Sequence, residues 1–173
     1  MTSRRVTAGA AALLAAITFG ATGCSNDDTS ETTTLEKPWD PCTLSDETLQ
    51  KATIDPATQG PALAAETSWE ENCGWKTHDG TGVSMNALST ATVEQFRERP
   101  SNIDFRTVTV GDRSAVTFRT EGDERGTFCY LVVPFQGEGL VLMQVARSAF
   151  TKEATPMCEV AVQIGDALVA EIP

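Results

Sequence analysis

The sequence contains few of the groups on which most enzymes rely. Its 173 residues include one histidine, His78, which stands beside Asp79 and Gly80 in a predicted turn. No serine lies in a Gly-x-Ser-x-Gly context, and only that histidine could serve a serine as its base. The phosphate-binding loop, the Gly-x-Gly-x-x-Gly fingerprint and the EF-hand loop are also missing from the sequence. We expect His78 to be a solvated loop residue and not a general base, and we predict no catalytic residue and no cofactor.

Adjacent carboxylates are the remaining candidates for acid–base chemistry. They occur as Glu70 with Glu71 and as Asp123 with Glu124. Two carboxyl groups can act as general acid and general base when they flank a scissile bond. Adjacent carboxylates on turns are usually solvated instead, and we expect that of these four.

Basic residues are scarce. The chain has 13 Lys and Arg against 24 Asp and Glu, and the 23 residues before Cys24 hold two of the basic residues and none of the acidic ones. From Cys24 onward the formal charge is therefore −13. Such a surface repels nucleic acid and anionic headgroups, so we exclude nucleic-acid binding and expect any membrane association to depend on a lipid. The acidity predicts solubility, with an electrostatic docking surface for a basic partner as the alternative.

The apolar run at residues 6–19 is too short to span a bilayer. Arg4 and Arg5 precede it, which is the pattern of an export signal. The residues that follow, Ala21, Thr22, Gly23 and Cys24, resemble the bacterial lipobox, although Ala21 stands where leucine is most common. That resemblance implies a diacylglycerol on the Cys24 thiol and a signal peptide of residues 1–23 that is cut off before it. Ordinary secretion after cleavage nearby is the alternative.

Residues 24–37 contain one large apolar side chain among polar ones, so we expect a flexible tether. Residues 38–173 have the length of a single domain. Together with the lipid that the lipobox resemblance implies, this organisation predicts a location on the extracytoplasmic face of the cell membrane.

Four cysteines remain once Cys24 carries lipid: Cys42, Cys73, Cys129 and Cys158. An even number in an exported chain indicates two disulfides, for which three pairings exist. Pairing of neighbours in the sequence would join Cys42 to Cys73 and Cys129 to Cys158. A zinc site that includes His78, five positions after Cys73, is the competing interpretation. We predict no metal site, because the sequence lacks a Cys-x-x-Cys pair and the compartment is oxidising.

The apolar pattern predicts short helices and strands in a mixed order. We expect a helix at residues 43–52 with Thr43 as its N-cap, a loop at 53–65, and a helix at 92–99. The predicted strands are 69–76, 83–87, 105–110, 114–119, 127–135 and 140–145. A last helix carries the apolar stripe Met157, Ala161, Ile164, Leu168 and Ile172. The order indicates an α+β fold in which an antiparallel sheet is packed against short helices and a C-terminal helix.

Several short motifs together carry a family resemblance. After the lipobox come Asp40-Pro41-Cys42 and Cys73-Gly74-Trp75, then Cys129 in an apolar strand and Cys158 at the start of the last helix. This set resembles the small actinobacterial lipoproteins that are grouped as a domain of unknown function. The resemblance implies a cell-envelope location and two disulfides, and it implies no activity.

Three tryptophans are the candidates for ligand contact, because an indole offers a flat apolar face. We expect Trp75 to pack on a disulfide in the core. Trp39 and Trp69 flank polar stretches and are candidates for the rim of a ligand groove, with partial burial without a ligand as the alternative. The sequence thus favours a membrane-anchored, non-catalytic binding or accessory module. The alternatives are a docking or regulatory protein for a membrane or secreted partner, and an envelope hydrolase.

Overall fold

The computed structural model describes residues 39–62, 71–149 and 155–173, which belong to one compact unit of residues 36–173. Within these ranges seven antiparallel strands form one sheet in the order β1-β2-β3-β7-β6-β5-β4. In chain order the strands are β1 (Ile54–Gly60), β2 (Glu71–Thr77), β3 (Gly82–Leu88), β4 (Asn102–Val110), β5 (Arg113–Thr120), β6 (Phe128–Pro134) and β7 (Leu140–Ala146). The helices are α1 (Asp46–Lys51), α2 (Val93–Arg97) and α3 (Met157–Leu168), with short 3-10 turns η1 (Pro41–Thr43) and η2 (Val169–Glu171). The predicted α+β fold is confirmed.

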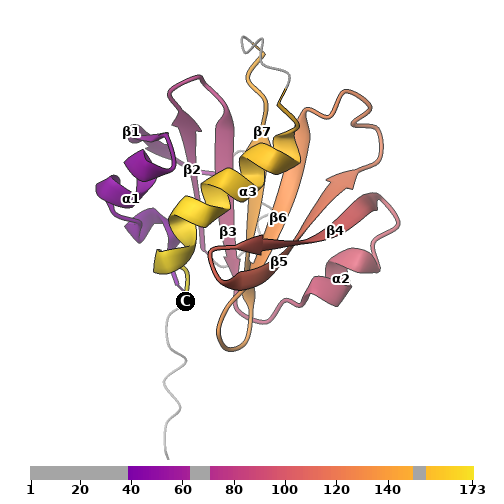
Figure 1. Cartoon of the computed structure of the whole chain (residues 1–173). Coiled ribbons are helices and arrows are strands. Elements are labelled where there is room, and N and C mark those ends of the chain that lie inside the picture. Colours follow the sequence, from indigo (N-terminus) through magenta and orange to yellow (C-terminus); the bar gives the residue numbers. More distant parts are fainter. Residues whose placement is uncertain (1–38, 63–70, 150–154) are drawn as a thin grey trace, which may run out of the picture. The chain divides into compact units, whose positions relative to one another are not determined.

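Helix α3 crosses one face of the sheet diagonally (Figure 1) and packs on β6, β7 and β4. The predicted stripe is buried from Met157 to Leu168, and Ile172 is buried beyond η2. Gly165 lies on the inner side of the helix, where an added Cβ would stand 2.6 Å from Leu131 Cδ2. The missing side chain therefore lets the helix approach the sheet closely. No helix in the described ranges is long and apolar enough to cross a membrane.

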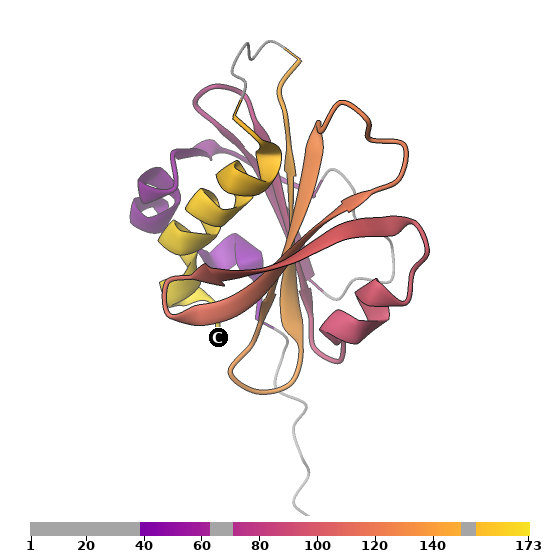
Figure 2. The same cartoon turned by 45° about the vertical axis from the view of Figure 1, so that its right-hand side comes forward.

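A second apolar cluster covers the part of the sheet next to α2. Its centre is Phe118 of β5, whose ring stacks on Phe105 at 5.2 Å and on Tyr130 at 4.8 Å between centroids. Phe96 of α2 lies 5.8 Å from the same ring. Figure 2 shows α2 beside the β4–β5 hairpin and apart from α3. The sheet is thus packed on two sides, with the larger cluster under α3.

Two disulfides link helical segments to the sheet. Cys42 of η1 is bonded to Cys73 of β2, and Cys129 of β6 is bonded to Cys158 in the first turn of α3. The pairing of neighbours in the sequence is confirmed. Because Cys73 is bonded to Cys42, it is not available as a metal ligand. The predicted zinc alternative is therefore not supported at this cysteine.

The prediction of a loop at residues 53–65 was wrong for its first half, where the chain forms β1. Pro56 and Gly60 indicated a loop, but β1 is an edge strand that pairs only with β2. Proline is tolerated there because its missing N–H costs no hydrogen bond on the open side. The pairing with β2 is also irregular between Asp55 and Gly60. The strand predicted at 69–76 is confirmed from Glu71 onward, and residues 69 and 70 lie outside the described residues.

The predicted N-cap of the first helix was also wrong. Ser45, not Thr43, caps α1, because the Ser45 hydroxyl accepts a hydrogen bond from the Thr48 N–H. The Thr43 hydroxyl instead donates to the Asp40 carbonyl, 2.7 Å away, within η1. Glu171 accepts hydrogen bonds from the hydroxyls of Thr48 and Ser45, and these bonds lower its pKa. The start of α1 is thereby tied to the end of the chain.

Candidate functional site

An open cleft of about 440 Å³ lies at the amino end of α3. Its walls come from β4, β5, the β5–β6 turn, β6 and the first turn of α3. The cleft has the size of a small-molecule site. Its lining residues are Asp104, Arg106, Arg119, Glu124, Arg125, Gly126, Phe128, Arg147, Pro156, Met157, Cys158 and Glu159.

Arginine dominates the chemistry of this cleft. Four of the seven arginines that follow Cys24 line it, although the chain is strongly acidic. Arg106 of β4 is paired with Thr117 of β5, and Arg119 lies two positions after Thr117. Since side chains alternate along a strand, Arg106 and Arg119 share one face of the sheet. We call the site the arginine cleft.

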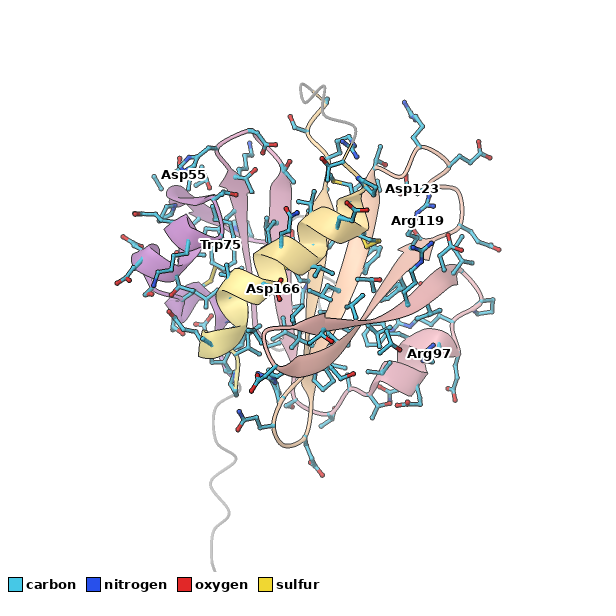
Figure 3. All side chains as sticks on the ribbon, viewed as in Figure 1. Asp55, Trp75, Arg97, Arg119, Asp123 and Asp166 are labelled. Carbon is cyan, nitrogen blue, oxygen red and sulfur yellow. A yellow bond between two sulfur atoms is a disulfide. The ribbon has the colours of Figure 1, made fainter. Side chains whose placement is uncertain are left out.

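Arg119 and Arg147 are held in place by hydrogen bonds. One Arg119 nitrogen donates to the Asp104 carboxylate at 3.5 Å, and another donates to the Asp123 carbonyl. Figure 3 shows Arg119 and Asp123 next to each other by the β5–β6 turn. Arg147 donates to the Thr155 carbonyl at 2.6 Å. The hydrogen bonds of these two arginines connect neighbouring segments that form the walls of the cleft.

Arg106 and Arg125 differ from that pair. Both side chains are exposed, and neither guanidinium has an ion-pair or hydrogen-bond partner among the residues that the structure describes. A guanidinium presents several N–H donors in a planar fork that matches carboxylate and phosphate groups. Arg106 and Arg125 are therefore the donors of the cleft that can turn toward a ligand.

The turn that carries Arg125 is organised by Asp123, whose side chain is only 7% exposed. It accepts hydrogen bonds from the Thr127 N–H at 2.8 Å, from the Thr127 hydroxyl at 2.6 Å and from the Phe128 N–H at 2.9 Å. Burial opposes ionisation of the carboxyl, but these hydrogen bonds outweigh it and lower the pKa of Asp123. The prediction of a solvated carboxylate was wrong for Asp123, whereas Glu124 and Glu71 are not buried. Glu70 lies outside the described residues.

The first turn of α3 forms the opposite wall. Pro156 occupies the N-cap position, so no side chain caps the helix. The positive end of the helix dipole adds to the field of the arginines. Phe128, which is 39% exposed, is the one exposed large apolar side chain among the described residues, and it lines the same cleft. The cleft thus places cationic donors beside an aromatic ring.

His78 is exposed on the turn between β2 and β3, in agreement with its expected position. It lines a second cleft of about 410 Å³, which shares Arg147 and Met157 with the arginine cleft. Its neighbour Asp79 accepts hydrogen bonds from the Thr77 hydroxyl and from the Thr81 N–H, and the first of these is the main reason that its pKa is lowered. Asp79 therefore shapes the turn.

The tryptophans lie away from the arginine cleft where the structure describes them. Trp39 is half-buried and makes an edge contact with Phe135, with ring centroids 6.3 Å apart. Trp75 is 2% exposed and belongs to the core cluster that contains Cys73, so its expected burial in the core is confirmed. Trp69 and the lipidation candidate Cys24 lie outside the described residues. Among the residues that the structure describes, no group of three or more histidine, cysteine, aspartate or glutamate side chains could hold a metal ion.

A family of proteins of unknown function, DUF3558, matches residues 18–171. The chain belongs to the DUF3558 family. The matched range contains the Asp40-Pro41-Cys42 and Cys73-Gly74-Trp75 motifs and all four disulfide cysteines. No curated protein and no solved structure matches the chain.

Sequence reasoning missed the arginine cleft of this DUF3558 protein because no motif carries it. Its four arginines are spread over 42 positions, from 106 to 147, and come together only through the sheet order. The predicted hairpin did not reveal it either, because the three-residue turn between strands 105–110 and 114–119 would set Arg106 opposite Phe118, whereas the observed two-residue turn pairs Arg106 with Thr117. The contribution of α3 depends on the Cys129–Cys158 pairing.

Proposed function

We propose that this DUF3558 protein is a lipid-anchored binding or accessory module on the extracytoplasmic face of the membrane, that it is non-catalytic, and that the arginine cleft is its ligand site. The observation that carries the proposal is the concentration of arginine in one small cleft of an acidic domain. Arginine collected against the overall charge of a protein indicates selection for a ligand, since solubility alone would not gather it.

The exposed surface favours a ligand cleft as the binding site, in preference to a broad protein-docking face. Protein interfaces commonly show a contiguous exposed apolar patch. In the described part of the chain, Phe128 is alone among large apolar side chains in being exposed, and it lies at the cleft. The docking or regulatory alternative would have to use the acidic surface. A hydrolase would have to use carboxylates alone or His78, and His78 lies outside the arginine cleft.

The anchor is tested by replacing Cys24 with Ala. The residues before Cys24 and the polar stretch after it support lipidation, and an acylated protein with more than one chain attaches stably to a membrane. We expect Cys24→Ala to move the protein from the membrane fraction to the soluble fraction. Equal partitioning of the two forms would refute the anchor.

The site is tested by filling the cleft and screening for ligands. Glu159, exposed on the first turn of α3, lines the arginine cleft, whereas Gln163, one turn later, lines only the second cleft. A ligand at a hundred times its Kd stabilises a protein by about 2.7 kcal/mol, which a melting curve detects. We screen envelope lipids, glycans and secreted proteins in this way. We expect at least one of them to stabilise the wild type and the Gln163→Trp variant but not the Glu159→Trp variant.

The opposite pattern, with loss only in Gln163→Trp, would place the site in the second cleft and refute our assignment. A screen without any stabilising ligand would favour the docking alternative. Pull-down from detergent-solubilised membranes would then identify the partner.

A further inference from the structure

The charged groups of the arginine cleft specify more than a general binding site. Arg119 and Arg147 are engaged with the protein itself, and Asp104 is engaged with Arg119. Among the lining residues this leaves Arg106 and Arg125 as cations and Glu124 and Glu159 as anions, all four with exposed side chains. Over the whole lining, four arginines and three carboxylates leave one net positive charge, so the cleft matches a single anionic group and would repel a ligand with many negative charges.

We infer that the arginine cleft binds an amphiphile with a single phosphate-type anion, in which Arg106 and Arg125 hold the anion and Phe128 contacts the attached apolar group. This inference rests on the proposed function. Charge-assisted hydrogen bonds from a guanidinium to a phosphate are among the strongest that a side chain can make. Phe128 belongs to the same cleft as both arginines, so the anion and its apolar group can be bound together.

The first turn of α3 adds backbone N–H donors to those of the two arginines. Met157 and Cys158, the first two residues of the helix, line the cleft, and the cap position offers no side chain to their N–H groups. An anion near these amides also gains from the helix dipole. Glu124 and Glu159 can accept hydrogen bonds from hydroxyl groups, so a hydroxylated headgroup would satisfy both signs of charge in the cleft.

The inference is tested by calorimetric titration of the soluble Cys24→Ala protein with three probes. Hexyl phosphate carries both features, inorganic phosphate carries only the anion, and hexanol carries only the apolar group. We expect hexyl phosphate to bind more tightly than either fragment. Loss of one guanidinium–phosphate contact should weaken hexyl phosphate by about tenfold or more in both Arg106→Gln and Arg125→Gln.

Two further variants separate the parts of the site. Phe128→Ser should weaken hexyl phosphate but leave the affinity for inorganic phosphate unchanged. Arg97→Gln is the matched control, because Arg97 lies on α2, where its guanidinium stacks 4.9 Å from the centre of the Phe105 ring and does not line the cleft. It should bind all probes as the wild type does. Denaturation curves would establish that all four variants are folded.

Equal affinity of hexyl phosphate for the wild type and for both cleft-arginine variants would overturn the inference. If a screened ligand is blocked by Glu159→Trp yet ignores both arginine variants, the ligand class is wrong while the proposed binding function stands. Competition by dihexanoyl phosphatidylglycerol would identify a lipid headgroup as the natural source of the anion. Binding of hexyl phosphate without that competition would identify a soluble phosphate ester.

Discussion

Replacing Asp123 with Asn tests how the wall of the arginine cleft is built. The Asp123 carboxylate accepts three hydrogen bonds, two on Oδ1 from Thr127 and one on Oδ2 from the Phe128 N–H. Asparagine has one acceptor oxygen, so its NH₂ group must face at least one of these donors. A fully buried donor left without an acceptor costs about 1 to 3 kcal/mol, but the Thr127 donors are only partly buried and the Phe128 N–H is exposed. We therefore expect Asp123→Asn to lower the free energy of unfolding by about 1 kcal/mol, the lower end of that range, at neutral pH.

The pH dependence distinguishes this mechanism from a general loss of stability. The pKa of Asp123 is lowered from its ordinary value of 3.8 by hydrogen bonds that outweigh burial. A depressed pKa in the folded state contributes stability that is fully present above the unfolded pKa and is lost as the pH falls through the folded pKa. The wild type should therefore lose this contribution in acid. The difference in unfolding free energy between the wild type and Asp123→Asn should become smaller below about pH 4.

The assay is urea denaturation followed by tryptophan fluorescence at neutral and at acidic pH. Glu124→Gln is the matched control, since Glu124 is the adjacent carboxylate, is exposed and has no such bonds among the described residues. It should unfold within about 0.5 kcal/mol of the wild type at neutral pH. Equal effects of the two substitutions, or a gap for Asp123→Asn that does not change with pH, would refute the account of the turn.

Two further predictions concern the packing of α3. Gly165→Ala should lower the free energy of unfolding by about 1 to 3 kcal/mol despite alanine's higher helix propensity, because the new Cβ would lie 2.6 Å from Leu131 and 3.1 Å from Val110. Gly137→Ala, where nothing lies within 4 Å, should be neutral or slightly stabilising in the same urea titration, and a stabilised Gly165→Ala would show that the helix stands farther from the sheet. Replacing both Cys129 and Cys158 by Ala should cost roughly 3 to 4 kcal/mol, since the bond closes a loop of 29 residues, and an unchanged melting temperature would contradict the stapling of α3.

The sheet was predictable where strands alternate and turns are marked by glycine. Gly111 stands between two β-branched runs and predicts the β4–β5 hairpin, in which it adopts a positive φ of 58°. Gly137 and Gly139 predict the β6–β7 hairpin in the same way. The stripe of α3 was equally clear, because four of its residues face the core at helical spacing. A regular spacing of apolar residues indicates that an element is buried on one face. These elements have such a face, so the sequence predicts them.

The edge strand β1 was not predictable in the same way. Its burial alternates only weakly after Ile54, and Pro56 is a loop signal whose meaning depends on the position of the strand in the sheet. Thr53 adopts a positive φ of 60° just before it, without a glycine to mark the turn. Pairing with β2, a tertiary interaction, decides the conformation of these residues. The arginine cleft escaped prediction for a similar reason, since sheet order and a disulfide bring its walls together.

Arginine is a common contact for the phosphates of nucleic acid, but the surroundings of this cleft argue for a smaller anion. A polyanion binds through many phosphates at once, each matched by a basic side chain. Here Asp104, Glu124 and Glu159 stand among the arginines, and from Cys24 onward the chain carries a formal charge of −13. Every phosphate beyond the first would therefore meet an acidic surface. A ligand whose single anion enters the cleft meets little of that repulsion. Salt at physiological concentration screens the distant carboxylates, since the Debye length is about 8 Å, whereas the proposed contacts with Arg106 and Arg125 are made at hydrogen-bond range. The overall acidity and the local arginines thus act together as a filter that favours ligands with a single anionic group.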